Sequence, residues 1–332
     1  MNGRQIEAPG ELAIFRLFSP VCKRLPKDLP EVRAVTKLMI RRQVPRLIPP
    51  AVLELLCMKL PKLESMVYEP WRVLQSILQA VYHSSTFAAP TSLFGQLLTC
   101  NPTGLASAVR SLPCRIKNVS IFEEFSDQLV SALRNDSMFP ELVMGKTNAN
   151  ITLAEAFVWK SLDFERFAIS YFIDARQFFD CCSRSYKWRR LQSLTLTAST
   201  LTQAAPKKKI YRLLCDAGKA ALKMPRLESL ALWNSKGKEA CAVLYHRKRK
   251  GACKMASLTW RGTWDLELSH DVVEAWQKVG SGAYYLRVAN ERVTGDINSH
   301  GDAIYHLRLP DGVIDPVSLR QIRQEGMMQR LA

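Results

Sequence analysis

The sequence contains no apolar run of the roughly 18 to 20 residues that a membrane-spanning helix needs. The opening stretch MNGRQIEAPGELAIF carries acidic residues within its apolar part, which argues against a secretory signal peptide. We therefore expect neither a signal peptide nor a membrane partner. The expected location is cytoplasmic and/or nuclear.

Metal and redox motifs are also missing. The nine cysteines include no C-x-x-C pair, and none of the five histidines stands four residues from another histidine or from a cysteine. Such cysteines are typical of reduced thiols in an intracellular protein. No zinc site and no cofactor is expected.

Motifs for catalysis are incomplete. The stretch MGKTN (144–148) contains Gly-Lys-Thr, but Pro140 occupies the place of the first glycine of a phosphate-binding loop. His270-Asp271 and Cys181-Cys182 lack a third catalytic partner and a glycine elbow. We assign these residues structural roles and predict a protein that is not an enzyme.

Acidic residues are outnumbered, with 30 Asp and Glu against 47 Lys and Arg, a net charge of +17. Two segments concentrate the excess: Lys207, Lys208 and Lys209, and the run HRKRKGACK (246–254) with Arg247, Lys248, Arg249 and Lys250. The second run is interpreted first as a solvated loop, because it lacks the interleaved aromatic residues that stack on bases. A localisation or nucleic-acid patch remains the alternative.

What the sequence does contain is a repeat. LPKLES (60–65) and MPRLES (224–229) are nearly the same phrase, in which proline ends a helix and the alternation that follows indicates a strand. Apolar residues at positions 1, 4 and 6 define a template that occurs seven times. The members are Val35-Leu38-Ile40, Leu63-Met66-Tyr68, Ile116-Val119-Ile121, Phe164-Phe167-Ile169, Leu191-Leu194-Leu196, Leu227-Leu230-Leu232 and Met255-Leu258-Trp260.

The spacing of these triplets predicts a repeat architecture. Successive first members are 28, 53, 48, 27, 36 and 28 residues apart, so one divergent unit is expected inside each of the two long gaps. Helical patterns occupy 49–60, 208–224 and 271–279, between or after triplets. The predicted fold is α/β: an irregular leucine-rich-repeat-like solenoid with a parallel sheet on the concave face and helices on the convex face.

Several stretches carry a family resemblance. LPEVRAVTKLMIRRQVPRLIPPAVLELLCMKLPKLESMVYEPWR (29–72), AGKAALKMPRLESLALWN (217–234), ASLTWRGTWDLELSHDVVEAWQKV (256–279) and VIDPVSLRQIRQE (313–325) resemble an uncharacterised group of fungal F-box proteins with an irregular leucine-rich-repeat-like region. The resemblance implies a substrate receptor that docks to a ubiquitin ligase through a Skp-type adaptor. Residues 1–28 show no F-box pattern. The predicted domains are an N-terminal extension (1–28), the solenoid (29–279) and a C-terminal cap (280–332).

Strand alternation then selects binding residues. If positions 1, 4 and 6 point into the core, positions 3, 5 and 7 point to the open face. Large residues at these positions are the most informative, because exposed Trp and Arg often anchor interfaces. We predict a protein-binding surface that includes Trp233, Arg261, Phe122, Arg41 and Arg166.

The leading hypothesis is a non-enzymatic module that recognises a protein partner. The alternatives are a basic nuclear protein that binds nucleic acid through 207–209 and 246–254, or a pathway-associated protein of unknown molecular role.

Overall fold

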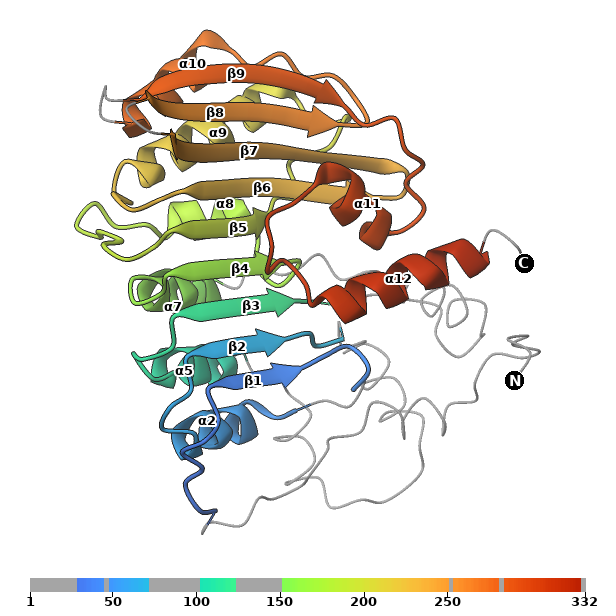
Figure 1. The fold of residues 1–332 in the computed structure, drawn as a ribbon. Helices are drawn as coiled ribbons and strands as arrows, with labels where there is room; N and C mark the ends of the chain where they lie inside the picture. The colour runs from blue at the N-terminus through green and yellow to red at the C-terminus, as the bar shows by residue number, and fades with distance from the viewer. Residues whose placement is uncertain are drawn as a thin grey trace.

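The computed structural model describes residues 29–44, 48–71, 102–123, 151–250, 253–280 and 284–329. These residues form one nine-stranded sheet and eight α-helices, and the strands follow one another across the sheet in chain order. The sheet is open, with β1 and β9 as its two outermost strands (Figure 1). The fold is therefore mixed α/β with a mostly parallel sheet.

The first six strands are parallel and share one register. They are β1 (Lys37–Ile40), β2 (Ser65–Tyr68), β3 (Asn118–Phe122), β4 (Arg166–Ser170), β5 (Ser193–Thr197) and β6 (Ser229–Lys236). The seventh triplet lies on β8 (Cys253–Gly262), where Ser257 aligns with Ser229 through His246 of the strand between them. Each predicted triplet thus ends on a strand, and equivalent positions of the template are aligned across the sheet.

Two features of the predicted repeat are wrong. β2 is hydrogen-bonded directly to β3, and β3 directly to β4, so the sheet has no strand of a hidden unit between these neighbours. Residues 72–101 and 124–150, which make up much of those gaps, lie outside the described residues, as does the stretch MGKTN.

The second wrong feature is the alternation of strand and helix, which breaks down at β7 (Glu239–Lys250). This strand runs antiparallel between β6 and β8, so the expected alternation of strand and helix fails here. Gly237 begins the turn from β6 with φ 59, a left-handed conformation that glycine adopts without steric cost. The basic run that begins at His246 is consequently part of a paired strand, not a solvated loop.

Six helices lie on one side of the sheet, called here the back (Figure 1). They are α2 (Pro50–Lys59), α5 (Pro102–Ser111), α7 (Ile151–Ser161), α8 (Ala175–Asp180), α9 (Lys207–Ala221) and α10 (His270–Gln277), the last continued by the 3₁₀ turn Lys278–Gly280. The three predicted helices match α2, α9 and α10 and are confirmed. Proline at the first position of α2 and the Asp174–Gln177 capping box of α8 explain where these helices begin.

The main core lies between the sheet and the back helices. Leu194, Leu230 and Leu258, each at the fourth template position of its strand, are fully buried. α9 and α10 pack closely over them, because a Cβ at Gly218 would lie only 3.3 Å from the Cβ of Ala275. The apolar triplets therefore point into the core, as the template requires.

The C-terminal residues form the last strand and two helices on the opposite side, called here the front. β9 (Tyr285–Arg292) pairs in parallel with β8 and ends the sheet. α11 (His300–Leu307) then packs against β6 and β7, and α12 (Pro316–Gln329) begins near the carboxyl ends of β2 and β3 and extends outward past the strand ends (Figure 1). In the described part of the chain, no helix is long and apolar enough to cross a membrane.

Candidate functional site

The front carries a row of accessible polar side chains, one from each strand, defined here as the front row. Strand pairing aligns Lys37, Ser65, Asn118, Arg166, Ser193, Ser229, His246, Ser257 and Arg287 in this order across the sheet. All nine are exposed or half-buried, and none is acidic. Ser229 donates a hydrogen bond to Ser193 at 2.9 Å, which links neighbouring strands within the row. The front row is thus a continuous surface of hydroxyl, amide and cationic groups.

The opposite end of the front is covered, which corrects the predicted exposure of Phe122 and Trp233. Both side chains are fully buried in a second apolar core, built with residues of α11 and α12 such as Ile304 and Ile322. Tyr171 makes edge-to-face contacts with both rings, at centroid distances of 5.6 Å to Phe122 and 5.2 Å to Trp233. The two rings are buried because the C-terminal helices return over this part of the sheet face. The prediction that these two aromatic residues bind a partner therefore loses its premise of exposure.

The three predicted arginines occupy different surroundings. Arg166 is exposed in the front row. Arg41 forms an ion pair with Asp315 at 3.4 Å, and Arg261 is held by Glu291 at 2.6 Å and by the carbonyl oxygen of Leu307 at 2.7 Å. Of the five predicted residues, Arg166 alone lies in the front row.

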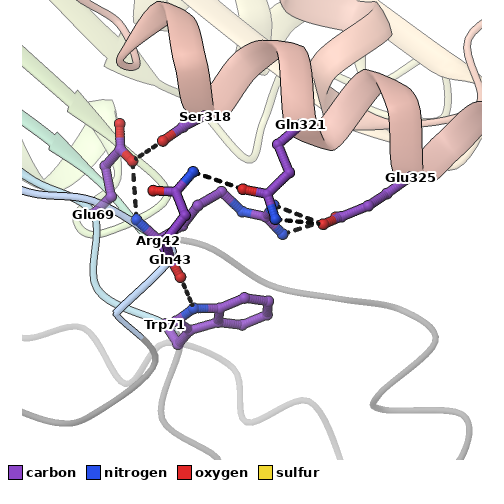
Figure 2. A network of polar contacts seen from close by, with 7 residues as sticks. All are labelled: Arg42, Gln43, Glu69, Trp71, Ser318, Gln321 and Glu325. Carbon is purple, nitrogen blue, oxygen red and sulfur yellow. Dashed lines mark hydrogen bonds and ion pairs between the residues drawn. The ribbon is translucent and has the colours of Figure 1, made fainter. Parts of the chain in front are cut away.

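A polar cluster, called here the polar anchor, fixes α12 to the beginning of the sheet (Figure 2). It consists of Arg42, Glu69, Ser318 and Glu325. Arg42 donates from two guanidinium nitrogens to the two oxygens of Glu325 at 2.9 Å, and its backbone N–H donates to Glu69 at 3.1 Å. Ser318 donates its hydroxyl hydrogen to the same Glu69 carboxylate. Residues 283 positions apart in the chain thereby meet in one network.

Surrounding contacts hold the polar anchor in place. The backbone N–H of Asp315 donates to Glu69 at 2.8 Å, while Trp71 donates its indole N–H to the carbonyl oxygen of Arg42 at 2.7 Å. The Arg42 guanidinium also lies 5.1 Å from the centre of the Trp71 ring, within cation–π range. Burial raises the pKa of Glu69, although its hydrogen-bond donors favour the charged carboxylate. No sequence motif marked these residues, because they converge only in the folded chain.

Residues 111–315 match a family described as a family of unknown function (DUF6546). The match spans more than half of the 332 residues. The chain belongs to the DUF6546 family. The DUF6546 region covers β3 to β9 and α11, whereas β1, β2 and α12 lie outside the matched range. The comparisons with curated proteins and with solved structures gave no match.

The two basic segments of this DUF6546 chain lie at opposite ends of the strands. Lys207, Lys208 and Lys209 are exposed in the first turn of α9, which follows the carboxyl end of β5. Arg247, Lys248, Arg249 and Lys250 are in the last part of β7, which reaches the amino ends of the parallel strands because β7 runs antiparallel to them. Arg247 donates to the carbonyl oxygen of Pro225 at 3.0 Å. The segments therefore do not combine into one basic patch.

Burial lowers the reactivity of cysteine thiols in the DUF6546 chain. Desolvation raises the pKa of Cys57 to about 11 and that of Cys182 to about 12, and it also raises the pKa of Cys181. A high pKa leaves little thiolate at neutral pH, and the thiolate is the reactive form. Among the described residues, no group of three His, Cys, Asp or Glu side chains is arranged to hold a metal ion.

Proposed function

We propose that this chain is a non-enzymatic protein-recognition module built as an irregular leucine-rich-repeat-like solenoid, and that the front row binds its partner. The parallel strands in one register and the helices on the back support the solenoid part of this proposal. The observation that carries the binding part is the accessible front row, which crosses nine strands without one carboxylate.

The dimensions and charge of the front row suit an extended acidic segment of a protein. Nine strands spaced about 4.8 Å apart give a row of about 38 Å, the length of about eleven residues of extended chain. Lys37, Arg166 and Arg287 distribute positive charge along this length, and each is exposed. Small hydroxyl residues between them leave room for a polypeptide to approach the sheet. Electrostatic complementarity of this kind selects partners and accelerates their association.

The resemblance to F-box proteins suggests a biological setting for this recognition. A substrate receptor of a ubiquitin ligase needs one surface for its target and a second for a Skp-type adaptor. The front row would serve the target, and residues 1–28, which lie outside the described residues, show no F-box pattern for the adaptor. We therefore propose target recognition for this chain, in the cytoplasm and/or nucleus.

Charge reversal in the front row tests the proposal. Affinity capture with the wild-type chain should recover protein partners that Lys37→Glu with Arg166→Glu no longer recovers, because an acidic segment would then meet repulsion. The matched control is Lys208→Glu with Arg212→Glu, two exposed residues of α9 in the back layer. Equal recovery by the wild-type chain and the front-row variant would contradict the proposal. Equal loss in both double variants would point to a general charge effect instead.

A further inference from the structure

A second candidate site lies at the carboxyl ends of β8 and β9, where these strands meet α11. A cleft of about 350 Å³ opens there, lined by residues that include Arg261, Glu291, Arg292, Gly295, His306 and Arg308. We call it the arginine cleft. Its volume is in the range of small-ligand sites, but its lining is polar rather than apolar. The ligand class must therefore be sought from charge.

The lining of the arginine cleft carries a positive excess. Three arginines and one glutamate give a formal charge of +3 − 1 = +2. Arg261 is already oriented by Glu291 and by the carbonyl oxygen of Leu307, so its guanidinium is held in a defined position. Arg292 pairs with Asp265 outside the lining, and including this residue lowers the excess to +1. Both members of that pair are more than 60% exposed, so the pair is weak and a competing anion can displace it.

Arg308 has a backbone conformation that is unfavourable for arginine. It ends α11 with φ 50 and ψ 52, in the left-handed region where glycine or asparagine is the usual residue. Its side chain is exposed and forms no ion pair or hydrogen bond within the described part of the chain. Strained backbone positions that hold a polar side chain at a cleft are typical of functional sites. The guanidinium of Arg308 is thus available to a ligand.

Gly295 and His306 form another part of the lining. A Cβ at Gly295 would overlap the His306 ring, so the imidazole occupies the space that any other residue would fill. Tyr305 packs edge-to-face against the same ring, at a centroid distance of 5.3 Å. The glycine therefore leaves room for the imidazole ring of His306 in the lining of the cleft.

We propose that the arginine cleft binds a phosphate group carried by a small molecule or by a phosphorylated side chain. Guanidinium groups from three elements offer planar forks of N–H donors, which match phosphate oxygens better than a single carboxylate. A phosphate monoester carries about −1.5 to −2 charges at pH 7, close to the excess of the lining. This site is separate from the front row, so it stands or falls independently of the proposed protein recognition.

Calorimetric titration of the full chain tests the proposal with inorganic phosphate, with a phosphoserine peptide and with the same peptide unphosphorylated. The wild-type chain should bind phosphate or the phosphopeptide and should not bind the unphosphorylated peptide. Preference for inorganic phosphate would identify a small phosphorylated ligand, and preference for the phosphopeptide a phosphorylated protein. Binding of neither phosphorylated probe at millimolar concentration would overturn the proposal.

Matched variants locate the binding. Arg308→Gln should weaken the affinity about tenfold or more, the effect of losing one charge-assisted hydrogen bond. Arg212→Gln, an exposed arginine of α9, should leave the affinity unchanged. Gly295→Val would overlap the His306 ring, displace this part of the lining and should also weaken binding, while circular dichroism confirms that each variant is folded. Equal affinities of the Arg308→Gln and Arg212→Gln variants would show that the charge excess acts without this cleft and would overturn the assignment.

Discussion

Replacement of Trp233 tests whether this residue stabilises the core or binds a partner. The side chain is fully buried under α11, and its ring makes an edge-to-face contact with Tyr171. Truncation of a buried tryptophan to alanine costs about 3 to 5 kcal/mol of unfolding free energy. Trp233→Ala should therefore lower the urea midpoint by about 1 to 2 M, since the dependence of unfolding free energy on urea is on the order of 3 kcal/mol per M for a chain of this size.

Trp233→Phe provides the sharper comparison. The indole N–H of Trp233 is buried without a hydrogen-bond partner in the described structure. An unsatisfied buried donor costs about 1 to 3 kcal/mol, so its removal offsets much of the lost ring area. The aromatic contact with Tyr171 is kept. The unfolding free energy of Trp233→Phe should thus remain within about 1 kcal/mol of the wild-type value, well above that of Trp233→Ala.

Urea unfolding followed by far-ultraviolet circular dichroism measures both effects without relying on tryptophan fluorescence. Arg166→Ala is the control, because an exposed front-row residue should change the unfolding free energy by less than about 0.5 kcal/mol. The reasoning is refuted if Trp233→Ala leaves the midpoint unchanged while weakening partner binding. It is also refuted if the phenylalanine variant is as unstable as the alanine variant.

Three further predictions concern the cleft, the back layer and the polar anchor. Arg308→Gly should stabilise the chain by about 1 kcal/mol in thermal unfolding, because glycine tolerates φ 50, and should weaken phosphate binding; a loss of stability would contradict the strain argument. Lys208→Glu should stabilise by about 0.3 to 1 kcal/mol at low salt, since the first turn of α9 holds three lysines and no acid, and high salt should reduce the gain. Burial raises the pKa of Glu69 above its ordinary 4.5. The contribution of Glu69 to the unfolding free energy is therefore largest below pH 4.5 and is lost as the pH rises through the raised pKa. The unfolding free energy of the wild-type chain relative to Glu69→Gln should therefore increase as pH falls through this window, and urea titrations showing the reverse would contradict it.

The sequence predicted the strands well because their signal is local. Leu194, Leu230 and Leu258 recur with a fixed spacing inside short segments, and burial on one face of a strand requires that spacing. Register followed from the same template, since a slip by one residue would turn each apolar side chain away from the core. Helices such as α9 were equally visible from their apolar stripe.

The covered front could not be predicted in the same way. Whether Trp233 faces solvent depends on where α11 and α12 travel after β9, and no local pattern in 293–329 encodes that destination. The polar anchor depends on partners nearly the length of the chain apart, such as Arg42 and Glu325. The spacing of the triplets also gave a wrong prediction at β7. The segment from Leu227 to Met255 has a typical repeat length, yet it contains a hairpin.

The polar anchor has a consequence for how the chain unfolds. In a linear array of strand and helix units, each unit contacts only its neighbours, so an end can fray while the remainder stays folded. Here the last helix is bound to the first two strands through Arg42 and Glu69, and fraying at either end must break that long-range contact. The two termini of the array therefore protect one another, which favours a single cooperative unfolding transition. The same closure requires long-range contacts to form before folding is complete, and such contacts slow folding.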